Sequence, residues 1–149
     1  AASDVYKRQK NAKDMGYDMT LMGTDGMDGL LSVEGFDTSL AEGVLLMTPF
    51  SADDEKNADF VKAYKDAYDE TPNQFAADAY DGVHAVAEAL KEAGLGVDAD
   101  PTEVAEKLSK AMLKITVDGL TGKLTWNDKG QVQKEPTAYV ITDGKYVQA

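Results

Sequence analysis

The sequence predicts an α/β protein that forms part of a larger, two-lobed architecture. Two short apolar runs near its start, Met19–Met22 and Gly43–Met47, are predicted as buried strands. Three amphipathic helical stretches follow, and short β segments close the chain. No strand is expected between the helices, whereas a parallel sheet is built from several strand–helix units and is covered on both faces. The chain is therefore expected to carry only some of the strands of its fold.

The three helices are expected at residues 52–68, 73–93 and 100–113. Ser51 is the predicted N-cap of the first helix, whose acidic start suits the positive end of a helix dipole. The third opens with Asp100-Pro101-Thr102-Glu103, which supplies a cap, a proline at the first helical position and a capping-box glutamate. The second carries one apolar stripe at helical spacing, made of Phe75, Ala79, Val83, Val86, Ala87 and Leu90.

Short β segments are expected at Lys123–Trp126, Thr137–Ile141 and Lys145–Val147. Asn127–Gly130 and Asp143-Gly144 supply the turns that connect them. The tail therefore differs in kind from the helical middle of the chain.

Composition excludes several classes of function. Asp and Glu number 27 against 15 Lys and Arg, a formal net charge of -12 that disfavours nucleic acid and anionic membrane surfaces. The absence of cysteine excludes disulfides, thiolate metal sites and cysteine nucleophiles. No apolar run reaches the roughly 20 residues of a membrane helix. Residues 1–9 (AASDVYKRQ) join poorly to the amphipathic sequence after them, and we expect a non-native leader there, with no signal peptide in the chain.

The sequence lacks complete catalytic and metal-binding motifs. The single histidine, His84, is expected on the flank of the second helix, and no G-x-S-x-G motif occurs. Asp25 and Asp28 resemble the start of a calcium loop, but Met27 occupies the third ligand position. We therefore expect no enzyme, no metal and no cofactor.

The glycine-rich segment Gly23–Gly29 (GTDGMDG) directly follows the first predicted strand. Ligands of open α/β sheets bind at this end of the strands. The segment matches neither G-x-G-x-x-G nor a P-loop, and its carboxylates disfavour a phosphate. A carboxylate at this position suits an ammonium group better.

Five motifs occur in one order: GTDG (Gly23–Gly26), EGV (Glu42–Val44), FVKAYKDAYDETPN (Phe60–Asn73), FAADAYDGVHAVAEAL (Phe75–Leu90), and DPTEVAEKL leading into GLTGKLTWNDKGQ. Together they resemble the branched-chain amino acid binding proteins of ABC transporters, the leucine/isoleucine/valine type, over residues 10–149. The resemblance implies the C-terminal portion of a type I periplasmic-binding-protein fold. In that fold two three-layer αβα lobes are joined by a hinge and close on the ligand like a Venus flytrap.

The resemblance also implies a division of the chain. Residues 10–48 would belong to the second lobe, residues 49–119 to a helical segment of the first lobe, and residues 120–149 to a crossover hairpin and the C-terminal strands. Thr48-Pro49-Phe50 and Leu120–Gly122 are the expected hinges. Because parts of both lobes are missing, we expect exposed apolar surface.

Three ligand-binding residues follow from the resemblance. Asp25 matches the carboxylate that receives the ligand's α-ammonium, the alternative being a turn aspartate that caps its own loop. Phe75 matches an aromatic that packs on the ligand's side chain, the alternative being ordinary helix core. Met27 touches the ligand or is an exposed loop methionine.

The function implied is an extracytoplasmic solute-binding protein, periplasmic or a cell-surface lipoprotein. It would capture a branched-chain or related amino acid and deliver it to an ABC permease. A sensing receptor domain of the same fold is one alternative, and a nucleotide-using α/β enzyme is another.

Overall fold

Two sheets organise the chain, one in each of the two compact units into which it divides. The computed structural model describes residues 2–149, with side chains from Lys7 onward. The first unit holds the residues up to Gln74 together with Pro136–Ala149, and the second is Phe75–Glu135. The helix that follows Pro49 belongs to the first unit, although the sequence groups it with the later helices. The assignment of segments to lobes stays a prediction.

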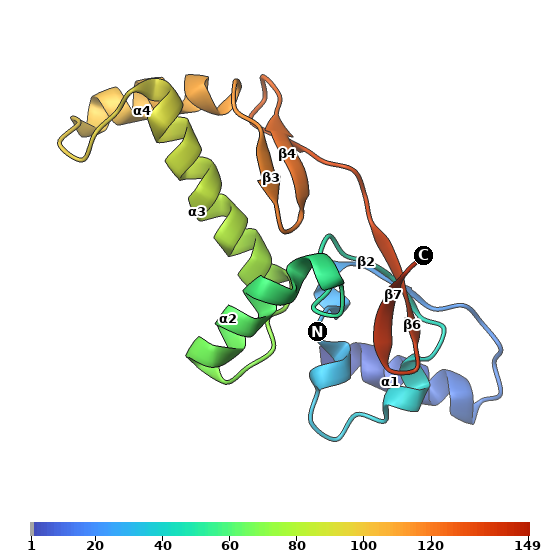
Figure 1. Cartoon of the computed structure of the whole chain (residues 1–149). Helices are drawn as coiled ribbons and strands as arrows, with labels where there is room; N and C mark the ends of the chain where they lie inside the picture. The colour runs from blue at the N-terminus through green and yellow to red at the C-terminus, as the bar shows by residue number, and fades with distance from the viewer. Residues whose placement is uncertain (1) are drawn as a thin grey trace. The chain divides into compact units, whose positions relative to one another are not determined.

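The sheet of the first unit is mixed, with strand order β1-β2-β6-β7. Its strands are β1 (Met22–Gly23), β2 (Leu45–Met47), β6 (Ala138–Thr142) and β7 (Lys145–Gln148). The pair β1–β2 is parallel, while β2–β6 and β6–β7 are antiparallel. Figure 1 shows β6 and β7 as a hairpin, and its turn residues Asp143 and Gly144 both have positive φ, as the predicted turn requires. Leu46 lies opposite Tyr139, and both side chains are buried in the core.

The helices of the first unit begin with α1 (Ala2–Asp14), which is followed by Gly16 at φ 70. This helix extends through residues 2–9 of the expected leader. The non-native origin of residues 1–9 stays a prediction, and Ala1 lies outside the described residues. Short 3₁₀ helices fill the loops: η1 (Asp25–Met27), η2 (Leu30–Ser32), η3 (Thr38–Ala41) and η4 (Glu55–Asn57).

Helix α2 (Ala58–Tyr68) starts later than the sequence predicts. Ser51 is not its N-cap, because the Ser51 hydroxyl accepts from the N–H of Asp53 at 3.1 Å within a preceding turn. Asp54 caps the intervening η4 by accepting from the N–H of Lys56 at 3.3 Å. A run of three acidic residues offers several competing caps, so the sequence alone did not identify the first helical residue.

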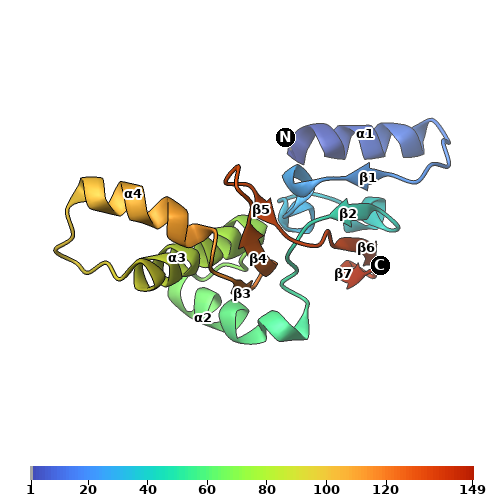
Figure 2. The ribbon, with the colours of Figure 1, turned by 90° about the horizontal axis from the view of Figure 1, so that it is seen from above.

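The second unit combines two long helices with a small antiparallel sheet, β3-β4-β5. Its elements are α3 (Gln74–Ala93, whose first residue lies in the first unit), α4 (Pro101–Met112), β3 (Val117–Gly119), β4 (Gly122–Trp126) and β5 (Val132–Gln133). The predicted start of α4 is confirmed, since Asp100 caps it by accepting from the N–H of Thr102 at 2.8 Å. Figure 2 shows α4 beside the later turns of α3, where both contribute to one apolar core.

Helix α3 buries a face different from the one its apolar stripe predicts. Small residues and one carboxylate make the buried face, namely Ala77, Asp81, Ala85 and Ala89. The predicted stripe is largely exposed, with Phe75 at 54% and Val83 at 71%. The stripe therefore does not form the core of the second unit, because alanines allow α4 and the small sheet to approach the opposite face closely. The exposed apolar surface expected from the sequence is confirmed here.

Candidate functional site

The glycine-rich loop leaves the first sheet at the carboxyl end of β1, where Asp25 opens the 3₁₀ helix η1. Two backbone bonds fix this turn: Met27 N–H donates to the Thr24 carbonyl at 2.9 Å, and Asp28 N–H donates to the Asp25 carbonyl at 3.0 Å. The side chain of Asp25 is exposed to solvent. The loop therefore presents a carboxylate at the strand end, where a ligand of an open sheet binds.

Met27 folds back over the strand from which the loop emerges. A Cβ atom at Gly23 would collide with the Met27 thioether, so any side chain at this position would displace the Met27 side chain from the strand. The Met27 side chain is half-buried and packs against the core cluster of Leu30, Ala41, Val44 and Ile141. Met27 is thus not an exposed loop methionine, and its contact with a ligand stays a prediction.

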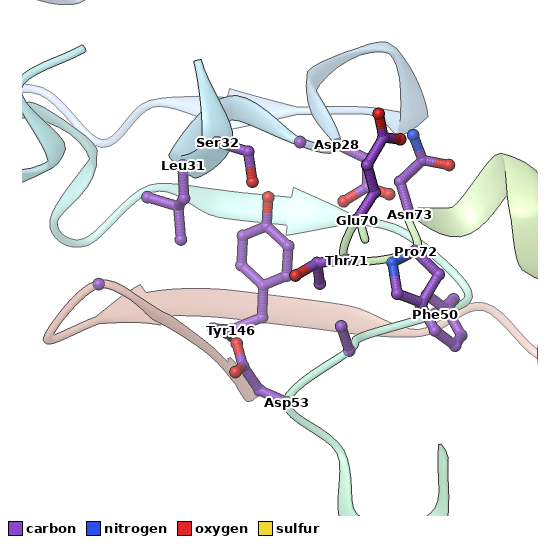
Figure 3. Close-up of a pocket in the computed structure, with 13 residues that line it drawn as sticks. Asp28, Leu31, Ser32, Phe50, Asp53, Glu70, Thr71, Pro72, Asn73 and Tyr146 are labelled. Carbon is purple, nitrogen blue, oxygen red and sulfur yellow. Dashed lines mark hydrogen bonds between the residues drawn. The ribbon is translucent and has the colours of Figure 1, made fainter. Parts of the chain in front are cut away.

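A pocket of about 760 Å³ lies in the first unit, and the end of the glycine-rich loop, Asp28 and Gly29, forms part of its lining (Figure 3). Four segments line it: residues 28–32, residues 50–53, residues 70–73 and the β6–β7 turn with Tyr146. Among the described residues of its lining, Asp28, Asp53 and Glu70 are carboxylates and none is a lysine or an arginine. Its electrostatic field therefore favours a cationic or hydrogen-bond-donating group. Asp25 does not line this pocket.

Tyr146 extends from β7 into the pocket, as Figure 3 shows. Burial is the main cause that raises the pKa of its phenol, and the nearby charge of Asp28 raises it further. The backbone N–H of Tyr146 donates to the Asp53 carboxylate at 3.2 Å. The phenol therefore stays protonated at neutral pH.

The first residue of α3 connects several distant segments. Gln74 N–H donates to the Asp28 carboxylate at 2.6 Å, and the Thr48 hydroxyl donates to the Gln74 side-chain oxygen at 2.8 Å. Thr48 and Gln74 are both almost completely buried. The sequence offered no signal for Gln74, whereas Asp28 was visible as the second aspartate of the glycine-rich loop.

Phe75 follows Gln74 directly and lies in the second unit. It is half-exposed and does not belong to the apolar core of that unit, so the alternative of ordinary helix core is not supported. His84 lies farther along α3, exposed and with its ring 4.4 Å from that of Tyr80, on the helix flank as expected. The contact of Phe75 with a ligand stays a prediction.

Asp81 ties the β3–β4 turn to α3 inside the second unit. Its carboxylate accepts from the N–H groups of Leu120 and Thr121, both at 2.8 Å, and from the Thr121 hydroxyl at 2.7 Å. Asp81 is only 3% exposed, and Gly119 approaches it so closely that a Cβ atom would collide with the carboxylate. The expected hinge at Leu120–Gly122 is therefore held firmly to the helix.

Two further features limit the chemistry available. No group of three or more histidine, aspartate or glutamate side chains among the described residues could hold a metal ion. Within residues 2–149 every helix is too short or too polar to cross a bilayer.

Known structures share the fold of this chain. The leucine-binding protein LivK of Thermotoga maritima is 22% identical, with a TM-score of 0.73 over 99% of this chain and 41% of its own. LivJ of Streptococcus pneumoniae, solved with isoleucine, is 26% identical, with a TM-score of 0.75 over 99% of this chain and 42% of its own. A leucine-, isoleucine-, valine-, threonine- and alanine-binding protein of Brucella ovis in its closed conformation is 22% identical, with a TM-score of 0.77 over 97% of this chain and 39% of its own.

The chain thus spans about two fifths of the length of these relatives. No curated protein matches it. The predicted fold, part of a two-lobed type I periplasmic-binding-protein architecture, is confirmed. The family model described as periplasmic binding protein matches residues 2–145, and the chain therefore belongs to the periplasmic binding protein family.

Proposed function

We propose that the protein is a solute-binding protein of an ABC transporter that captures a branched-chain or related amino acid. Family membership supports this proposal, as do relatives whose names specify leucine and isoleucine. The observation that carries it is the exposed carboxylate of Asp25 at the carboxyl end of β1, in the G-x-[DE]-G segment. It follows that the protein binds its ligand without transforming it, and that an ABC permease is its partner.

Asp25 is the proposed receptor of the α-ammonium group. A charge-assisted hydrogen bond between a carboxylate and an ammonium is about twice as strong as a neutral one. Met27 and Phe75 are proposed to contact the ligand's side chain through their own apolar side chains. The ligand would favour a closed state of the whole protein, which the permease recognises.

Membership of this family implies an extracytoplasmic location. We place the protein more narrowly in the periplasm or on the cell surface as a lipoprotein. The net charge of -12 is consistent with a partner other than nucleic acid.

Substitution of Asp25 tests the proposal. In Asp25→Ala the dissociation constant for leucine rises roughly tenfold to hundredfold, because a hydrogen bond to a charged group contributes about 1.5–3 kcal/mol. Isothermal titration calorimetry measures this change. Asp18→Ala is the matched control, since Asp18 is also exposed but precedes β1. Equal leucine affinity in Asp25→Ala and wild type would contradict the site assignment.

A further inference from the structure

Helix α3 receives its N-terminal cap from a residue far away in the sequence. The first four N–H groups of a helix have no partner within the helix, and the first turn of α3 contains no acidic residue. The carboxylate of Asp28, 46 residues earlier, accepts from the N–H of Gln74 at 2.6 Å. A carboxylate at this position also suits the positive end of the helix dipole. Asp28 therefore acts as a long-range cap.

The same residue is bonded to the loop that carries Asp25. Asp28 N–H donates to the Asp25 carbonyl at 3.0 Å, so two hydrogen bonds connect Asp25 to Asp28 and Asp28 to Gln74. The peptide bond after Gln74 leads to Phe75. Gln74 is only 1% exposed, and its side chain is held by the Thr48 hydroxyl at 2.8 Å. The start of α3 is thus fixed from two sides.

We propose that Asp28 is a positioning residue for amino acid binding, acting through its hydrogen bond to the N–H of Gln74. The bond holds the Asp25 loop to the backbone of Gln74, within the first unit, before the ligand arrives. A preorganised site binds more tightly because less ordering remains to be done on binding. This inference rests on the proposed function, in which Asp25 and Phe75 contact the ligand.

The test compares variants that break the bond from each side. Asp28→Ala removes the acceptor, and Gln74→Pro removes the donor while leaving a residue that suits the first position of a helix. Each variant weakens leucine binding about tenfold in calorimetry, and the double variant is no weaker than Gln74→Pro alone, because both substitutions break the same bond. Asp28→Asn keeps an acceptor oxygen and recovers part of the affinity.

Gln74→Ala is the matched control for the proline variant, because it deletes the same side chain but keeps the N–H. Its loss of affinity is smaller than that of Gln74→Pro. If Asp28→Ala weakened binding while Gln74→Pro matched Gln74→Ala, Asp28 would act by touching the ligand, and the inference would be overturned.

Amide hydrogen exchange at Gln74 gives a second readout that needs no ligand. Exchange at this N–H accelerates at least about tenfold in Asp28→Ala and less in Asp28→Asn. Unchanged exchange in Asp28→Ala overturns the inference. If wild-type protein bound no leucine, the proposed function would fail, while the exchange result would still decide whether Asp28 holds the N–H of Gln74. Wild-type leucine affinity in a folded Asp28→Ala variant would overturn the inference alone.

Discussion

Asp81 anchors the β3–β4 turn to α3 in the second unit, and its removal has a predictable cost. Its carboxylate accepts three hydrogen bonds from the β3–β4 turn at 2.7–2.8 Å and is almost completely buried. In Asp81→Ala the N–H groups of Leu120 and Thr121 and the Thr121 hydroxyl lose their acceptor at once.

The magnitude follows from the charge and the burial. A hydrogen bond to a charged group contributes about 1.5–3 kcal/mol, and a buried donor left unpaired costs about 1–3 kcal/mol. The three bonds share one carboxylate, so their contributions are not additive. We expect Asp81→Ala to lower the free energy of unfolding of the second unit by about 3–5 kcal/mol.

Urea unfolding followed by tryptophan fluorescence measures this change directly. Trp126 is the only tryptophan of the sequence and packs against the core of the second unit, so its signal reports on that unit. Asp78→Ala is the matched control on the same helix. Asp78 is half-exposed and lies 3.6 Å from the Lys134 ammonium, a surface pair worth about 1 kcal/mol or less. A loss below about 1 kcal/mol in Asp81→Ala would refute the reasoning.

Two further predictions also concern the free energy of unfolding. Gly119→Ala places a methyl group against the Asp81 carboxylate and lowers the free energy of unfolding by about 1–3 kcal/mol. Gly82→Ala, which has open space around it inside α3, raises it by about 0.5–1 kcal/mol, and equal effects of the two substitutions would contradict the close approach of Gly119 to Asp81. Gln9→Met replaces a buried amide that has no hydrogen-bond partner among the described residues. We expect it to raise the free energy of unfolding by about 1–3 kcal/mol, measured by far-UV circular dichroism in urea, and a decrease would contradict this prediction.

Features set by neighbours in the sequence could be predicted from it. The start of α4 is specified by Asp100 and Pro101, a cap and a proline that act within one helical turn, and the structure has both in these roles. The β6–β7 turn at Asp143-Gly144 likewise follows from residues that tolerate positive φ. The strands β3 and β5 were not predicted, because their pairing with β4 depends on residues that they meet only in the folded chain.

The buried face of α3 shows where periodicity fails. The large apolar residues of the helix define one stripe at helical spacing, and helix core was the alternative that this stripe offered for Phe75. Burial instead follows the alanines, because a helix can approach its neighbours most closely on its smallest side chains. A helix that is apolar on two faces cannot be oriented by its sequence pattern alone.

Of the candidate site, the sequence could predict only the part that depends on local motifs. Asp25 could be proposed from its glycine-rich context and the motif around it. The role of Asp28 could not, because it depends on a hydrogen bond to a residue 46 positions away. Long-range hydrogen bonds of this kind leave no local pattern in a sequence.

Binding of leucine by the wild-type protein tests the central proposal most directly. Thermal unfolding is measured with increasing leucine and, separately, with increasing ATP. A ligand that binds only the folded state stabilises it in proportion to the logarithm of its concentration. The proposed function predicts a rise of the unfolding temperature with leucine and none with ATP. A rise with ATP and no response to leucine or to related amino acids would contradict it.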